Sequence, residues 1–191
     1  VRFDSLPAAN REFVRRLADS SGAEAGLKET TPVLSLLGSH GDQEQWCDPR
    51  KSQGHLGIPL ISSAFVGAIP MISRLLRELG VPLDWIDTHD PSAIQKTLAG
   101  SASLFFVEDA SQATDEQGRK IIAAEDFVSG YKIRSVFGIG GAYSNGEMLV
   151  TVAFSHDLFG RENAEQFLPL VTLLKSNTET LVAEGRIFAE A

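Results

Sequence analysis

The sequence predicts an α+β protein in which helices pack on a central antiparallel sheet and a long helix ends the chain. Two observations carry this expectation. An apolar hairpin pattern covers residues 133–155, with Asn145-Gly146 between its two halves. A sustained helical periodicity then covers residues 161–188. Together they place a hairpin at the centre of the fold and a helix against it.

Composition indicates a globular chain and excludes one class of partner. The 191 residues include 17 Lys and Arg and 25 Asp and Glu, a formal net charge of −8. An acidic chain without a basic stripe is a poor binder of nucleic-acid phosphates, and the nearest group of cations is only Arg11, Arg15 and Arg16. We therefore expect no nucleic-acid partner. The single cysteine, Cys47, excludes an internal disulfide.

The one stretch that resembles a membrane span is residues 52–73, which contains no Asp, Glu, Lys or Arg. Two prolines, three glycines, His55 and four serines interrupt it, and its apolar part is too short to cross about 30 Å as a helix. We interpret it as buried core and expect no membrane insertion. No leader pattern follows Val1, so we expect no signal peptide, a cytoplasmic location, and a piece of a longer protein.

The first third alternates between short elements and loops. The pattern predicts, in order, a short helix, a polar loop, a buried strand, an irregular polar segment and a second short apolar run (residues 10–18, 20–31, 32–37, 39–53 and 57–61). Helical spacing follows over residues 63–79, where Pro70 must kink the helix or restart it.

The middle of the chain carries weaker signals. Asp90-Pro91 is a cap and first-turn proline for a helix ending near Gly100. Beyond it the pattern predicts a strand, a polar loop and a short helix stopped by Gly130 (residues 103–107, 111–120 and 124–129).

The hairpin predicts the centre of the sheet. Both faces of its second strand, residues 147–155, are apolar, so we expect this strand to be central and covered on both sides. Asn145-Gly146 is expected to supply the positive φ angles of a tight primed turn. Gly138, Gly140 and Gly141 precede a turn rather than a helix, which argues for close packing or a bulge and against a dinucleotide-binding loop.

The last helix predicts an interface between copies. Apolar and small residues recur along it at alternating steps of three and four: Ala164, Phe167, Val171, Leu174, Thr178, Leu181, Gly185 and Phe188. A helix of residues 161–188 would extend about 42 Å, which is more than one domain's sheet can cover. We therefore expect a homodimer through this helix, and we divide the chain into residues 1–31, 32–160 and 161–191.

Several segments resemble a known family. The order IRSVFGIGG, GEMLVTVAF and RENAE (residues 133–141, 146–154 and 161–165) resembles the end of a GAF domain, a sensory module of bacterial signalling proteins. Five earlier or overlapping segments are similar to the N-terminal sensory region of bacterial sensor histidine kinases and related proteins: residues 34–41, 44–60, 69–80, 123–131 and 134–138. The resemblance implies a sensory input domain of a two-component system or a related signalling protein, with an output module outside this sequence.

The best candidate for a ligand site lies in the polar segment before the second apolar run. Flat apolar, charged and hydrogen-bonding side chains gather there, as in small-molecule pockets: Trp46, Asp48, Arg50, Ser52 and His55. The alternative is a structural loop in which Asp48 pairs with Arg50, Trp46 fills a gap and His55 bonds to the backbone.

The same segment offers other chemistry, which we consider and do not adopt. His40, Cys47 and His55, with Asp42, Glu44 and Asp48 between them, match no tight metal-ligand spacing. Cys47 with His55 could form a nucleophilic pair, and His55, His89 or His156 could ligate haem. We expect no catalytic residue and no metal, and no cofactor is identified.

The sequence therefore predicts a non-enzymatic sensory or regulatory domain. It would bind an unidentified small ligand or relay the state of a partner. Two alternatives stay open. One is a small enzyme that uses the His/Cys/Asp loop, and the other is a purely structural dimerisation module with a filled space beside its central strands.

Overall fold

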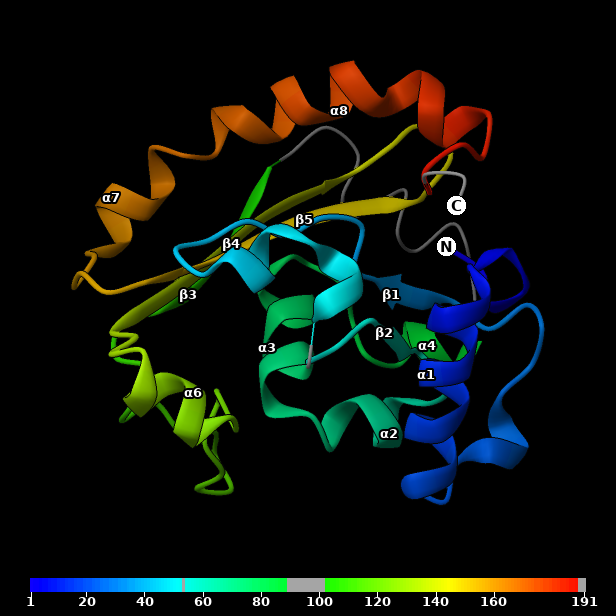
Figure 1. Ribbon diagram of the computed structural model, residues 1–191, viewed down its shortest axis with the longest axis horizontal. Coiled ribbons are helices and arrows are strands. Elements are labelled where there is room, and N and C mark those ends of the chain that lie inside the picture. The colour runs from blue at the N-terminus through cyan, green and yellow to red at the C-terminus, as the bar shows by residue number, and fades with distance from the viewer. Residues whose placement is uncertain (53, 89–101, 189–191) are drawn as a thin grey trace.

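The computed structural model describes residues 1–52, 54–88 and 102–188, and its chain folds into the expected α+β class (Figure 1). Two antiparallel sheets are present in the described part, one of two strands and one of three. The helix predicted after Asp90-Pro91 and the ring of His89 lie outside the described residues. In the described ranges, no helix is both long enough and apolar enough to cross a membrane.

The N-terminal elements surround the small sheet. A short helical turn η1 (Phe3–Ser5) and helix α1 (Ala8–Ser20) precede the turn η2 (Glu24–Gly26). Strand β1 (Val33–Ser35) pairs antiparallel with β2 (Gly57–Pro59). Between these strands the chain is irregular, as predicted, apart from the turns η3 (Glu44–Cys47) and η4 (Pro49–Lys51).

Pro70 restarts the helix rather than kinking it. Helix α2 (Ser63–Gly67) ends three residues earlier, and α3 (Pro70–Glu78) begins with the proline at its first turn, where the missing N–H has no partner to lose. A short helix α4 (Trp85–Thr88) follows. The predicted helical segment of residues 63–79 is therefore two helices.

The larger sheet has the strand order β3-β4-β5 (Ser103–Val107, Ser135–Ala142 and Met148–Ser155). The expectation that the second hairpin strand is central is wrong: β4 is central and buried at all eight positions, whereas β5, among the described residues, pairs with β4 alone and is half-buried. The small residues of β4 conceal this in the sequence, because burial on two faces there comes from glycine and alanine as much as from large apolar side chains.

The turn between β4 and β5 also differs from the prediction. Gly146 has φ +86°, whereas Asn145 does not have a positive φ. The Gly146 N–H donates to the Tyr143 carbonyl, and the Tyr143 N–H donates to the Glu147 carbonyl. This is a three-residue loop closed by a left-handed glycine, a common alternative to the two-residue primed turn.

Helices cover both faces of the larger sheet. On one face, α3 lies against Gly138 and Gly140 of β4. A Cβ at Gly138 would lie 3.1 Å from Leu75 Cδ1, and one at Gly140 would lie 3.2 Å from Leu79 Cδ1 and 2.9 Å from the Leu149 carbonyl oxygen. The close packing predicted for these glycines is confirmed. The main core forms here.

Helix α3 also binds the backbone of β3. The Arg74 guanidinium donates to the Phe106 carbonyl at 2.8 Å, and the Phe106 N–H donates to the Glu78 carboxylate at 2.9 Å. Arg74 and Glu78 are themselves paired at 2.7 Å. The N–H and C=O of Phe106, which point away from β4, are therefore not free to pair with a further strand on the outer edge of β3.

The predicted C-terminal helix is two helices, and it ends earlier than expected. Helix α7 (Arg161–Glu165) and helix α8 (Pro169–Ala183) are separated at residues 166–168, and Gly185, with φ +67°, stops the second one. The chain then turns back, so that Phe188 packs against the N-terminal cluster around Phe3 and Val14. The heptad pattern therefore does not continue through Gly185 and Phe188 on one helix.

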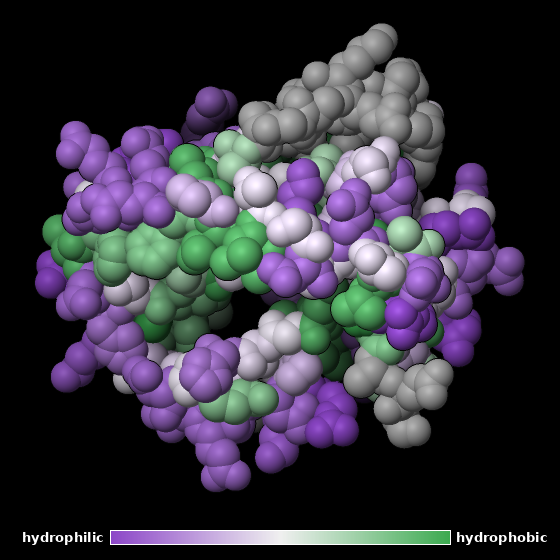
Figure 2. Space-filling view, turned by 90° about the horizontal axis from the view of Figure 1, so that it is seen from above, coloured by the Kyte–Doolittle hydropathy of each residue, from purple (hydrophilic) through white to green (hydrophobic). Residues whose placement is uncertain are grey.

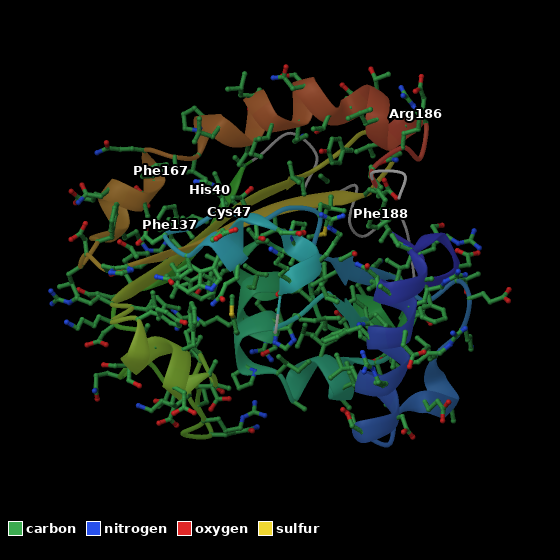
Figure 3. The ribbon with its side chains drawn as sticks, viewed as in Figure 1. His40, Cys47, Phe137, Phe167, Arg186 and Phe188 are labelled. Atoms are coloured by element: carbon green, nitrogen blue, oxygen red, sulfur yellow. The ribbon has the colours of Figure 1, made fainter. Side chains whose placement is uncertain are left out.

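The residues of the predicted heptad pattern also lie in two different environments. Ala164 and Val171 are buried on the sheet beside Phe137, and the Thr178 hydroxyl bonds to the Tyr143 hydroxyl at 2.6 Å. Phe167 contacts the Phe137 ring at 5.1 Å between centroids (Figure 3). The domain's own surface thus covers Val171 and Thr178, whereas Leu174 and Leu181 of the same heptad pattern are 37% and 38% exposed.

We predict that Gly140→Ala lowers the free energy of unfolding by about 1–3 kcal/mol, because the new methyl group would overlap the Leu149 carbonyl and press on Leu79. Gly67→Ala at the end of α2 is the control, since a Cβ there meets no atom within 4 Å. Urea unfolding measures both. Equal stability of the two variants would contradict the packing argument.

Candidate functional site

Trp46, the aromatic member of the predicted ligand site, is held by other aromatic rings. Its ring centroid lies 4.6 Å from that of Tyr131 and 5.9 Å from that of Phe127, both on helix α6 (Glu125–Gly130) or at its end. Its other neighbour is Gly41, where a Cβ would lie 2.7 Å from the indole. Trp46 therefore packs between the polar loop and α6 and holds the two together.

Asp48 and Arg50 form a pair within the loop. The Arg50 Nε–H donates to Asp48 Oδ1 at 2.9 Å, and Nη2 donates to Oδ2 at 3.0 Å. The same carboxylate also accepts the backbone N–H of Arg50, which caps the turn η4. These bonds, the side-chain one foremost, hold the pKa of Asp48 below its ordinary value.

Ser52 and His55 are the remaining two residues of the predicted ligand site. The Ser52 hydroxyl accepts the Gly54 N–H at 3.3 Å. The His55 residue is exposed, yet nearby protein desolvates its ring and lowers its pKa. None of the five predicted residues lines either of the two cavities described below. Their role in ligand binding stays a prediction.

The structure instead brings Cys47 to His40. The Cys47 Sγ lies 3.5 Å from His40 Nδ1, and both residues are exposed on the loop (Figure 3). The thiol also approaches the carbonyl oxygens of Gly41 at 3.5 Å and Gln43 at 3.8 Å. The nucleophilic pairing considered from the sequence used His55, so the partner was wrong. Spacing alone could not separate the two histidines, which lie seven and eight residues from Cys47.

Among the described residues, the structure assembles no set of side chains that could ligate a metal ion. No group of three His, Cys, Asp or Glu side chains comes together there. His156 is 53% exposed in its side chain and lies 3.6 Å from the Asp42 carboxylate.

A cavity of about 420 Å³ lies on the other side of α6 from Trp46. Its volume is in the range of small-molecule sites. The buried residues of its lining are apolar, and its rim is polar and charged: Ala110, Ile122, Val128 and Ile133, then Ser111, Ser129, Lys120, Lys132, Arg134, Glu125 and Asp126. Sequence reasoning missed it, because its residues come from a loop, a helix end and the start of a strand.

Polar interactions stabilise the loop of residues 111–120 beside this cavity. Lys120 donates its ammonium to the Ser111 carbonyl, which closes the loop over residues 111–120. Behind the rim, the Ser111 hydroxyl and, to a smaller extent, the Arg134 guanidinium lower the pKa of Asp109. The cavity thus has a rigid loop as one wall and α6 as the other.

A second cavity of about 370 Å³ lies near the N-terminal sheet and is lined by Gly26, Lys28, Thr30, Thr31 and Ile61. The Thr31 hydroxyl there accepts the Lys28 N–H at 2.8 Å. Only one charged side chain faces this space, so it offers less for ligand recognition than the cavity beside α6.

Helix α6 connects the cavity to the loop. Val128 and Ser129 line the cavity, whereas Phe127 and Tyr131 hold Trp46, and Phe127 also contacts Phe154 of β5 at 5.4 Å. Helix α6 therefore contacts both the cavity and the loop that carries Cys47.

Comparisons with known proteins supply no relative: no protein-family model, no curated protein and no solved structure matches this chain.

We predict that His40→Gln slows alkylation of Cys47 by iodoacetamide at neutral pH by about threefold or more. The effect should stay well below the ~100-fold that the loss of a positioned active-site base causes. The imidazole beside the sulfur can accept the thiol proton as the sulfur attacks. His55→Gln is the control, and mass spectrometry follows the single modified cysteine. Equal rates in both variants would show that the contact with His40 has no chemical consequence.

We also predict a pH dependence from His55. Its folded pKa is lowered from 6.5, so below that pH the unfolded chain takes up a proton that the folded chain resists. The free energy of unfolding should fall as the pH drops from 6.5 to about 5. His55→Gln should flatten that part of the curve, and His156→Gln is the comparison. An unchanged slope in His55→Gln would contradict this assignment.

Proposed function

We propose that this chain is a GAF-like sensory or regulatory input domain that binds a small ligand and relays its state through α8 to an output module. We place it in the cytoplasm and assign it no catalysis of its own. The resemblance to the input regions of bacterial sensor kinases supports this proposal. The residues that carry the resemblance include the β4–β5 hairpin and α7, which lie next to α8 in the fold.

The observation that carries the proposal is the two-sided character of α8. Its inner side is bound to the sheet through Val171 and Thr178. Another side exposes four leucines, of which Leu173 is 57% and Leu170 44% exposed, and the others are Leu174 and Leu181. Figure 2, which is seen from above, shows hydrophobic residues gathered in the left half of the view, with polar residues around them. A helix bound to the sensory sheet and still apolar outside can pass a movement to a neighbour.

A second copy of the chain is the occupant we propose for this side. Leu170, Leu174 and Leu181 follow the spacing of one helix stripe, as in helix pairs that associate along their length. The opposite flank carries Thr172, Ser176 and Glu179, so the apolar stripe has a defined edge. The homodimer expected from the sequence thus stays our proposal, with Leu174 and Leu181 retained in the contact and Leu170 added to it.

One observation favours an enzyme as the second candidate. The Cys47–His40 contact joins a nucleophile to a base on an exposed loop. The described residues do not bring a third group to orient the imidazole, and neither cavity reaches this pair. Turnover of an acyl or peroxide substrate that is lost in both Cys47→Ala and His40→Gln would favour the enzyme over the sensory domain.

We predict that Leu170→Asp/Leu173→Asp converts a dimer to a monomer, because the two most exposed leucines of α8, Leu170 in the stripe and Leu173 beside it, would each bring a charge into the contact. Light scattering over a concentration series measures the change, and the dissociation constant should rise at least about tenfold.

The matched control is Thr172→Asp/Ser176→Asp, which adds the same charge to the opposite flank of α8 and should leave the dimer intact. Circular dichroism confirms that both variants fold. A wild-type chain that stays monomeric at high micromolar concentration would overturn the dimer, and with it the proposed route of transmission.

A further inference from the structure

Helix α6 ends in a hydrogen-bonded motif that requires a left-handed residue. The Lys132 N–H donates to the Ser129 carbonyl at 3.3 Å, and the Ile133 N–H donates to the Val128 carbonyl at 2.9 Å. This pair of bonds places the residue after the helix cap in the left-handed region, where glycine is preferred. Here that residue is Lys132, with φ +52°.

Three other helices end in the same motif, and each uses glycine at the equivalent position. They are α1, α3 and α8, which end with Gly22, Gly80 and Gly185 at φ +66°, +85° and +67°. Their closing bonds match those of α6, for example from Val81 to the Leu76 carbonyl at 2.8 Å. Among the described residues, Lys132 is the only one other than glycine with a positive φ.

A lysine in this position is a disadvantage for folding. A side chain in the left-handed region crowds the backbone, whereas glycine adopts it without this cost. Residues held in such conformations concentrate at functional sites, where the side chain is needed for another reason. The side chain of Lys132 lines the cavity of about 420 Å³ beside α6.

Two further cationic side chains line the cavity. Lys120 and Arg134 lie there together with Lys132, and within the described ranges none of the three is within 4.0 Å of a carboxylate, although Asp109 behind the rim is close enough to Arg134 for its pKa to be lowered. The carboxylates of Glu125 and Asp126 also line it, which leaves 3 − 2 = +1 over the lining residues. In a chain of net charge −8, a local excess of positive charge favours an anion, and a single excess charge matches a monoanion.

The remaining lining indicates what the anion is attached to. Ile122, Val128 and Ile133 form the apolar part of the wall, next to the hydroxyls of Ser111 and Ser129. Apolar surface with a few convergent polar groups is the usual composition of a site for a small organic molecule. Inorganic anions would leave this apolar wall unused.

We propose that the cavity beside α6 binds a small organic monoanion, a carboxylate with a short apolar tail, and that Lys132 contacts its charged group. The inference deepens the proposed sensory function, on which it rests, by naming the class of ligand. Helix α6 then carries the effect of binding outward, since Tyr131 precedes Lys132 and holds the Trp46 ring at 4.6 Å.

The experiment measures affinity and stability in the same variants. Hexanoate is the probe, and hexylammonium and hexanol are the charge-reversed and neutral comparisons, all followed by calorimetric titration of the full chain. Hexanoate should bind the wild type more tightly than either comparison, and more weakly as salt rises. Lys132→Gly should weaken hexanoate binding about three- to fivefold and raise the Tm by about 2–4 °C.

The matched control is Gly185→Lys, which places a lysine at the equivalent position of α8, where a Cβ meets no atom within 4 Å. It should lower the Tm and leave hexanoate affinity unchanged. Trp46 fluorescence, compared with Trp46→Phe, reports whether hexanoate binding reaches the loop.

Two results would overturn the inference: hexanoate binding no tighter than hexylammonium, or Lys132→Gly with unchanged affinity for hexanoate. A gain in Tm without a loss of affinity would make Lys132 a strained residue with no role in binding. Because the readout is binding rather than oligomeric state, a failure here leaves the dimer test of the sensory proposal intact. A monomeric wild type that binds hexanoate would instead keep this site and remove the proposed relay.

Discussion

The whole fold depends on the burial of β4 between two layers of helices. Every residue of this strand is buried, with α3 on one face and α7 with α8 on the other. The two faces of β4 pack against their helices in different ways. Gly138 and Gly140 let α3 approach the backbone, whereas Phe137 and Ile139 fill the space under the C-terminal helices. An added carbon on the glycine face has no room, because the nearest atom at Gly140 is a carbonyl oxygen of the neighbouring strand.

That constraint fixes where change can occur. The centre of the sheet is close-packed and cannot shift without loss of the core, so a regulatory movement must involve the elements at its borders. Helix α6 is such an element: it has six residues, one side on a cavity, and aromatic contacts to the polar loop and to β5. Helix α8 is another, with one side bound by Val171 and Thr178 and another side exposed.

Much of the fold could be predicted from the sequence, and the failures have identifiable causes. The strand at residues 103–107 and the close packing at Gly138 and Gly140 are confirmed, and Pro70 restarts the helix, which was one of the two alternatives left open; each depends on local pattern or on the special geometry of proline and glycine. The central strand was misassigned because apolar content on two faces does not distinguish a covered strand from one that is only half-buried. The helix end at Gly185 was missed because a heptad pattern was followed past a residue that favours helix termination.

The site was harder to predict, since it depends on contacts between segments distant in sequence. Trp46 was correctly selected as a residue with a specific environment, yet that environment is the pair of rings on α6, more than 80 positions further along the chain. Lys132 gives a weaker signal: it lies three residues beyond a short predicted helix, at the position where three other helices of this chain, α1, α3 and α8, have glycine. A sequence that uses the favourable residue at three helix ends and a lysine at the fourth indicates which side chain is retained for a purpose other than folding.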